Sequence, residues 1–134
     1  MVITLFYACL LALIMAALGL RIPGQRGRTR VSLGDGGDPE LIARIRTFGN
    51  FVEWVPMILI LMLMIETVSG SIYYLHLAGI VLVLARILHS QSLRVTGTTK
   101  LQMRLRVIST VMTVATLILS AVYGLILTKP ALLI

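Results

Sequence analysis

Charged side chains are scarce in this 134-residue sequence: 13% of its residues are charged, against about 25% in an ordinary soluble domain. A single cysteine excludes an internal disulfide and a zinc site built from several cysteines. Aromatic residues make up 6%, too few for a platform on which nucleic-acid bases stack. Hydrophobic residues reach 58%, more than a water-soluble core of this length can hide. The composition therefore predicts an integral protein of the lipid bilayer with no nucleic-acid partner.

Four apolar stretches are long enough to cross a bilayer as helices, at about residues 2–20, 39–66, 72–90 and 105–128. A spanning helix needs roughly 20 predominantly apolar residues. The first stretch has no basic segment before it, so we interpret it as a retained span and not as a signal peptide. The predicted fold is an all-α bundle of four transmembrane helices, forming a single domain over residues 1–134.

The long hydrophilic stretch at residues 21–38 separates the first two apolar stretches. Pro23 and Gly24 disfavour a regular helix there, so we predict a basic loop. The second helix is predicted to begin after Asp38, with Asp38 as its N-cap and Pro39 at its first position.

The net charge of +7 is unevenly distributed along the chain. Basic residues fall into two blocks, 21–46 and 86–106, and Lys129 stands apart near the end. Basic loops are retained on the cytoplasmic side of a membrane. We therefore expect both basic loops to be cytoplasmic and both chain termini to lie outside.

A few polar side chains interrupt the apolar stretches. Arg46, Asn50 and Glu53 follow the spacing i, i+4, i+7 and share one helical face, as do Arg86 and His89 at i, i+3. Charged groups inside a span usually face the bundle interior or a wet cavity. One interpretation is structural: Glu53 pairs with Arg86, and Asn50 bonds to a neighbouring helix. The other is a cavity near the cytoplasmic surface for a small ligand that carries carboxylates and an amine.

Two basic residues, Arg104 and Arg106, open the fourth span. They either anchor the helix at the membrane surface or lie near the thiol of a bound substrate, where a cation favours the nucleophilic thiolate. No metal site is expected, because the chain has one other histidine, His76, which lies 13 residues before His89.

The run RIRTFGNFVEWVP at residues 44–56 resembles the second-helix signature of the MAPEG family, the membrane-associated proteins of eicosanoid and glutathione metabolism. The signature has an Arg four residues before an Asn, a Glu three residues after it, then an aromatic residue and a Pro. The run ARILHSQSL at residues 85–93 is similar to the family's Arg-x-x-His element. The residues at the second-helix positions are Arg46, Asn50, Glu53, Trp54 and Pro56.

The resemblance implies a homotrimer of four-helix subunits that binds glutathione as cosubstrate on the cytoplasmic side, between neighbouring subunits. It places an arginine near the glutathione thiolate, a position that Arg106 or Arg104 fills, with Arg106 slightly favoured. The sequence looks like the small bacterial branch of the family, which implies the bacterial inner membrane. The positions implied to hold glutathione are Arg46, Asn50, Glu53, Arg86 and His89.

Two positions depart from glutathione-using members. Gly49 stands where several of them carry an arginine, and Leu93 stands where they carry a tyrosine. We interpret the protein as a glutathione-dependent membrane transferase or peroxidase that acts on hydrophobic electrophiles. An alternative is a non-catalytic MAPEG-like membrane module that binds a ligand or a partner protein. A small multidrug transporter ranks third, since residues 2–20 lack the acid that such a transporter usually carries in its first span.

Overall fold

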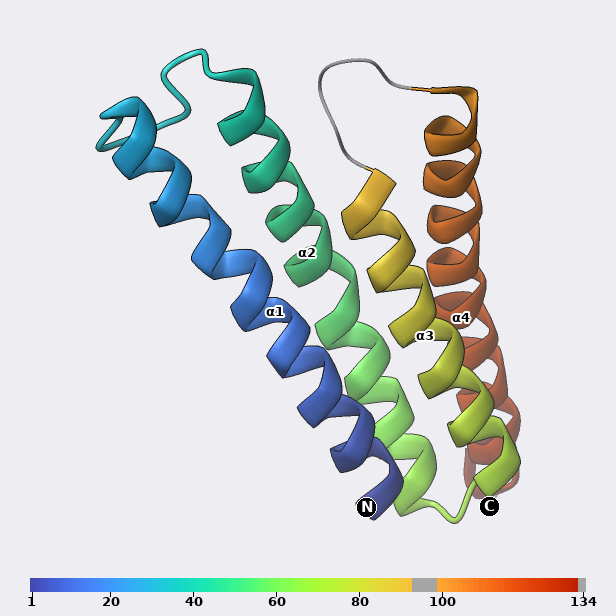
Figure 1. Cartoon of the computed structure of the whole chain (residues 1–134). Coiled ribbons are helices and arrows are strands. Elements are labelled where there is room, and N and C mark those ends of the chain that lie inside the picture. The colour runs from blue at the N-terminus through green and yellow to red at the C-terminus, as the bar shows by residue number, and fades with distance from the viewer. Residues whose placement is uncertain (93–98, 133–134) are drawn as a thin grey trace.

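The protein is a bundle of four long helices in a computed structural model (Figure 1). The structure describes residues 1–92 and 99–132, with the backbone alone for residues 130–132. All four helices are long and apolar enough to cross a membrane, which confirms the predicted all-α fold. Both chain ends and the α2–α3 turn lie at one end of the bundle, opposite the α1–α2 loop. The helices are α1 (Val2–Thr29), α2 (Pro39–Thr67), α3 (Ile72–Ser92) and α4 (Lys100–Leu132).

Helix α1 is longer than predicted. Residues 21–29 continue it, with Pro23 inside the helix, so the prediction of a loop from residue 21 was wrong. A proline removes one backbone hydrogen bond but leaves the rest of the ladder intact. Contact with α2 supports the extension, because Arg44 donates a hydrogen bond from Nη1 to the carbonyl oxygen of Arg21 at 2.8 Å. The helix ends at Thr29, and its C-cap residue Arg30 has a left-handed φ of 57°.

Helix α2 begins as the sequence predicts. Asp38 accepts a hydrogen bond from the Leu41 backbone N–H at 2.7 Å, and Pro39 occupies the first helical position. Helix α4 begins five residues before the predicted residue 105, at Lys100. A reciprocal capping box explains the earlier start: Gln102 N–H donates to Thr99 Oγ1, and Thr99 N–H donates to Gln102 Oε1.

The hydrophobic core joins α1, α2 and α3. Leu11, Ile58 and Leu82, one from each helix, are at most 1% exposed. Helices α1 and α3 approach closely at Gly79, where a Cβ atom would overlap the ring of Tyr7. A glycine at this position therefore sets the distance between the two helices.

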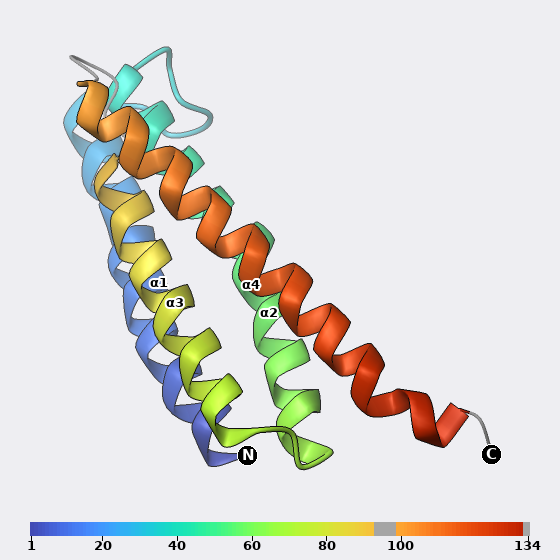
Figure 2. The same ribbon diagram turned by 90° about the vertical axis from the view of Figure 1, so that its right-hand side faces the viewer.

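Helix α4 packs in a different way. Among the described residues, it contributes no hydrophobic side chain to the buried core. Its C-terminal half leans away from the other three helices (Figure 2). Its buried side chains all carry hydroxyl groups: Ser109, Thr113, Thr116 and Ser120.

A carboxylate ties α2 to α1 at the end of the bundle that holds the chain termini. Glu66 accepts hydrogen bonds from the backbone N–H groups of Ile3 and Thr4, both at 2.9 Å. These two N–H groups belong to the first turn of α1, which has no partner for them within the helix. Glu66 therefore caps α1 from a neighbouring helix.

Candidate functional site

Arg86 is the centre of a buried polar cluster in the half of the bundle nearer the α1–α2 loop. Its side chain on α3 is 2% exposed. Nη1 donates to the Asn50 side-chain oxygen at 2.8 Å, and Nη2 donates to the Thr113 hydroxyl. Nε is buried and has no hydrogen-bond partner. The guanidinium thus links α2, α3 and α4, and no carboxylate in the described part of the chain forms an ion pair with it.

His89 lies one turn from Arg86 on the same face of α3 and is 6% exposed. Its Nδ1 lies 3.2 Å from the Ser109 hydroxyl oxygen. The Ser109 hydroxyl also lies within hydrogen-bond distance of the Arg106 carbonyl oxygen, at 2.9 Å. We call Asn50, Arg86, His89, Ser109 and Thr113 the Arg86 cluster.

The three polar residues of α2 lie on one face, as their spacing predicts. Asn50 is half-buried against Arg86, whereas Arg46 and Glu53 are exposed on the single chain. The expected ion pair between Glu53 and Arg86 is absent, because the Asn50 amide oxygen occupies that place. The expected bond from Asn50 to a neighbouring helix is present. The exposed groups form the edge of the cluster, where a ligand or a second subunit can reach them.

Helix geometry separates Arg104 from Arg106, although both side chains are exposed. At 100° per residue, Arg106 lies about 20° round the helix from Thr113, whereas Arg104 lies about 180° from it. Arg106 therefore lies near the beginning of α4 on the face that contacts the Arg86 cluster. Arg104 lies on the opposite face.

The hydroxyl residues of α4 belong to the site, although they were not among the residues predicted from the sequence. Ser109 is 0% exposed and Thr113 is 1% exposed, and both bond to side chains of α3. A signal was available, because Ser109, Thr113, Thr116 and Ser120 follow the spacing i, i+4, i+7, i+11. That spacing places the four hydroxyl groups along one face of an otherwise apolar helix.

The two departures from the family pattern differ in what the structure shows of them. A Cβ atom at Gly49 would lie 3.8 Å from Glu53 Oε1. A side chain at this position would therefore start beside the Glu53 carboxylate. Leu93 lies outside the described residues.

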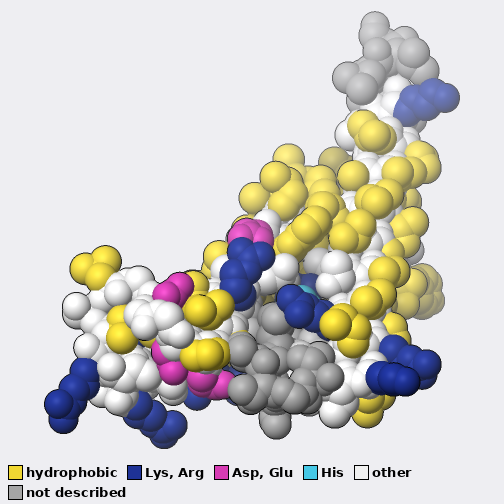
Figure 3. Space-filling view, turned by 90° about the horizontal axis from the view of Figure 1, so that it is seen from above, with side chains coloured by type: hydrophobic (Ala, Val, Ile, Leu, Met, Phe, Trp, Pro, Cys, Tyr) yellow, Lys and Arg dark blue, Asp and Glu magenta, His cyan; other side chains and the backbone are white. Residues whose placement is uncertain are grey.

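Charge gathers at the loop end of the bundle. Seen from that end, Lys and Arg side chains form several separate patches on the surface, and acidic side chains lie between some of them (Figure 3). Arg44 forms an exposed ion pair with Glu40 at 3.0 Å and points away from the face of Arg46. The excess of cations favours anionic ligands at this end.

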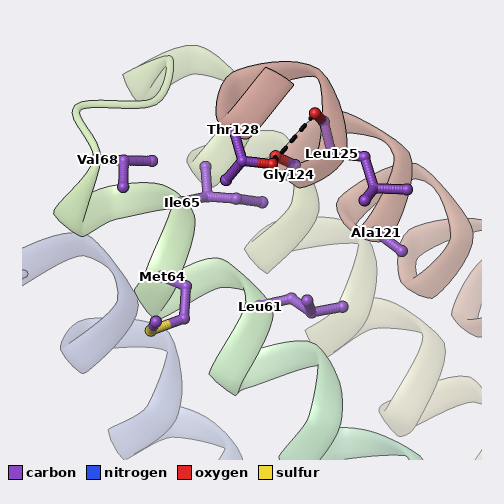
Figure 4. Close-up of a pocket in the computed structure, with 8 residues that line it drawn as sticks. All are labelled: Leu61, Met64, Ile65, Val68, Ala121, Gly124, Leu125 and Thr128. Atoms are coloured by element: carbon purple, nitrogen blue, oxygen red, sulfur yellow. Dashed lines mark hydrogen bonds between the residues drawn. The ribbon is translucent and has the colours of Figure 1, made fainter. Parts of the chain in front are cut away.

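The opposite end holds an apolar cleft of about 420 Å³ between α2 and α4 (Figure 4). Its one polar side chain, Thr128, already bonds to the Gly124 carbonyl oxygen of its own helix at 3.1 Å. The cleft thus presents hydrocarbon surface without a reactive group. Its lining consists of Leu61, Met64, Ile65, Val68, Ala121, Gly124, Leu125 and Thr128.

Comparison with known proteins agrees with this arrangement. The family model described as "MAPEG family" matches residues 4–126. The chain belongs to the MAPEG family. It is also similar to "Inner membrane protein YecN" of Escherichia coli strain K12, with 37% identity over 87 residues. The match covers 65% of this chain and 66% of the relative, just under two thirds of its length. The same protein of a second Escherichia coli strain matches equally well. No solved structure matches the chain.

Membership of the family and four apolar helices establish a MAPEG-type integral membrane protein. The printed name of the relative describes a location and no activity.

Proposed function

We propose that this MAPEG protein binds glutathione at the loop end of the bundle and joins its thiol to hydrophobic electrophiles. The observation that carries the proposal is the burial of Arg86 without a carboxylate partner in the described part of the chain. A buried cation without a counter-ion is costly and creates a field that favours an anion nearby. Glutathione has two carboxylates and one ammonium group, so it is a net anion at neutral pH.

The exposed edge of the Arg86 cluster offers complementary groups. Arg46 presents a fork of donors suited to a carboxylate, and Glu53 presents an acceptor suited to the ammonium group. Asn50 is held in place by Arg86, and its amide N–H donors have no partner among the described residues, so they suit the ligand backbone. In this proposal Arg86 and His89 approach glutathione from the bundle interior, since both side chains are buried in the single chain.

Arg106 is the residue that we assign to the thiol. A guanidinium near a thiol favours the thiolate, which is the nucleophile. Glutathione supplies the sulfur that bonds to the electrophilic carbon, and the leaving group departs with the displaced electron pair. Because the electrophile dissolves in the bilayer and glutathione in water, a site at the loop end of the membrane-spanning helices is accessible to both reactants.

The same resemblance supports a homotrimer in the bacterial inner membrane, with the basic loops cytoplasmic. Arg46 and Glu53 are exposed on the single chain, and Glu53 lies on a spanning helix. Charged side chains rarely face lipid. A neighbouring subunit covering this face of α2 would remove that cost and complete the binding site.

A second candidate is a non-catalytic membrane module that binds a ligand or a partner protein. The observation in its favour is that Asn50 and Thr113 already accept hydrogen bonds from Arg86. In that case the cluster holds three helices together and takes no part in a reaction. Gly49 removes one cation that several glutathione-using members carry.

A conjugation assay separates the two candidates. The purified protein is mixed with glutathione and 1-chloro-2,4-dinitrobenzene, and the rate is compared for the wild type, Arg106→Ala and Arg104→Ala. We expect Arg106→Ala to lower the rate by about tenfold to a hundredfold, as loss of a charge that stabilises the nucleophile does. Arg104→Ala serves as the matched control and should change the rate less than about threefold. Wild-type protein without activity above the uncatalysed rate would favour the non-catalytic module.

A further inference from the structure

An apolar cleft of about 280 Å³ lies between α3 and α4, along the middle of α4. We call it the α3–α4 cleft. The residues that line it all belong to these two helices. Those that matter for its shape and position are Leu77 and Val81 of α3 and Val111, Met112, Ala115 and Leu119 of α4.

The α3–α4 cleft lies on the side of α4 that is turned away from α2. At 100° per residue, Met112 and Leu119 lie about 100° and 120° from Thr113 in one direction. Ala121 and Leu125, which line the cleft toward α2, lie about 80° and 120° from Thr113 in the other direction. The α3–α4 cleft is therefore distinct from the face of α2 that we assign to glutathione and to a neighbouring subunit.

The walls of the α3–α4 cleft suit a hydrocarbon chain. Two polar side chains border it, and both already have hydrogen-bond partners in the bundle. Tyr74 donates from its hydroxyl to Ser120 Oγ at 2.8 Å. Thr116 donates to the Met112 carbonyl oxygen of its own helix, also at 2.8 Å. An occupant therefore gains contacts with apolar side chains and no new hydrogen bond from these two hydroxyl groups.

Two cations lie between the α3–α4 cleft and the loop end of the bundle, on the same strip of α4. Arg104 precedes Val111 by seven residues and Ala115 by eleven, so it lies within about 20° of both round the helix. Lys100 precedes Arg104 by about one turn. Both side chains are exposed, and neither forms an ion pair in the part of the chain that the structure describes. One wall of the cleft thus leads to two positive charges.

The distance between these charges and the cleft matches one leaflet of a bilayer. From Arg104, the α4 residues of the cleft extend from about 10 Å to about 22 Å along the helix axis. A leaflet is half of a bilayer about 40–45 Å thick, so it measures about 20–22 Å from its head groups to the midplane. When Arg104 lies at the depth of the head groups, the α3–α4 cleft lies at the depth of the acyl chains.

The anion that complements these cations comes from the membrane and not from a second copy of the chain. Three acidic residues lie at the loop end, and each has a partner within its own chain. Glu40 pairs with Arg44, and Asp38 caps α2. Asp35 accepts a backbone N–H within the α1–α2 loop at 2.9 Å. Basic sites between membrane-spanning helices are typical binding places for anionic lipid head groups.

We propose that the α3–α4 cleft binds an anionic phospholipid of the leaflet at the loop end. One acyl chain lies in the cleft, and the phosphate of the head group bonds to Arg104 and Lys100. The site depends neither on glutathione binding nor on catalysis, because it lies on the face of α4 opposite the Arg86 cluster.

The test is native mass spectrometry of the full-length protein in detergent, with phosphatidylglycerol and phosphatidylcholine added in equal amounts. The two lipids have identical acyl chains, and only the first carries a net negative charge. We expect phosphatidylglycerol to bind on the order of tenfold more tightly, because each cation near an anionic head group adds to the affinity. Soluble glycerol phosphate in excess should not displace the lipid, since it has no chain to fill the cleft.

A pair of double variants tests the cations. Lys100→Ala with Arg104→Ala should reduce the preference for phosphatidylglycerol to less than about threefold. Arg21→Ala with Arg28→Ala is the matched control, because it removes two exposed cations from the same half of the bundle on α1. The control should leave the preference unchanged within about twofold.

A second pair of variants tests the cleft and leaves the cations in place. Ala115→Phe fills the cleft and should weaken both lipids on the order of tenfold, the effect of excluding about two methylene groups. Ala16→Phe places the same side chain at an exposed alanine of α1 and should leave both affinities unchanged within about twofold. Circular dichroism establishes that each variant is folded.

Four results would overturn the proposal. The first two are equal binding of the two lipids by the wild type and an undiminished preference in the Lys100→Ala, Arg104→Ala variant. The third is displacement of the lipid by glycerol phosphate, which would assign the cations to a soluble phosphate. The fourth is a lower oligomer mass for Ala115→Phe, which the same spectra report and which would assign the cleft to a subunit contact.

Discussion

The contact among α1, α2 and α3 and the contact between α3 and α4 use different side chains. The first is apolar, with Leu11, Ile58 and Leu82 at its centre. The second buries hydroxyl groups of α4 against Arg86 and His89 of α3. In a bilayer, apolar side chains are solvated equally well by lipid, so apolar helices associate through close packing and polar ones through hydrogen bonds. The polar groups of the candidate site lie on the hydrogen-bonded side.

Replacing Gly79 with valine should give the largest loss of stability. The new side chain would overlap the ring of Tyr7 and force α1 away from α3. Overpacking typically costs 1–3 kcal/mol, and we expect about 3 kcal/mol here because the added atoms meet a ring packed in the core. Thermal unfolding in detergent measures the change.

Gly24→Val is the matched control for that substitution. No heavy atom lies within 4 Å of a Cβ at Gly24. The control should therefore change stability by less than about 0.5 kcal/mol. Equal losses for the two variants would show that helix propensity, and not the α1–α3 distance, decides the effect.

Replacing Thr113 with valine should have an intermediate effect, at the contact of α3 with α4. The shape is nearly kept, but Arg86 loses a hydrogen-bond acceptor in a buried place. Leaving a buried donor without a partner costs about 1–3 kcal/mol. Thr110→Val is the control, since Thr110 is exposed and its hydroxyl bonds only to the Arg106 carbonyl oxygen of its own helix. If both variants melt at the same temperature as the wild type, the buried hydroxyl groups of α4 do not stabilise its contact with α3.

Replacing Glu66 with glutamine should have the smallest effect of the three, about 1 kcal/mol. The amide keeps one acceptor oxygen for the N–H groups of Ile3 and Thr4 but loses the negative charge that stabilises a helix N-terminus. Glu40→Gln breaks an exposed pair with Arg44 and should cost about 0.3–0.5 kcal/mol. Hydrogen exchange at the start of α1 measures the first change locally. A Glu66→Gln protein with unchanged exchange there would contradict the capping role.

Much of the fold could be predicted from the sequence, because four long apolar stretches leave few alternatives in a bilayer. The start of α2 at Asp38 was equally predictable, since an N-cap and a proline act within a few residues. The extension of α1 past Pro23 was not, because it depends on contacts with α2. The cap of α1 by Glu66 joins residues more than 60 positions apart, and no local pattern encodes it.

The candidate site was predictable in part. Spacing placed Arg46, Asn50 and Glu53 on one face, and the structure brings Asn50 to Arg86 as one interpretation required. Spacing alone did not reveal which acceptor Arg86 would find, because a carboxylate and an amide on neighbouring turns both lie within reach. Thr113 was overlooked because a threonine in an apolar helix is unremarkable until a buried guanidinium is placed beside it.

The most direct test of the account is glutathione binding measured by calorimetry on Arg46→Ala and Arg44→Ala beside the wild type. The two arginines lie two residues apart but about 200° apart round α2, so only Arg46 shares the face of Asn50 and Glu53. We predict saturable binding that Arg46→Ala weakens about tenfold and Arg44→Ala leaves within about twofold. Folded wild-type protein that takes up no glutathione at about 10 mM, a concentration at which even a weak complex of about 1 mM Kd would be nearly saturated, would contradict the proposed site.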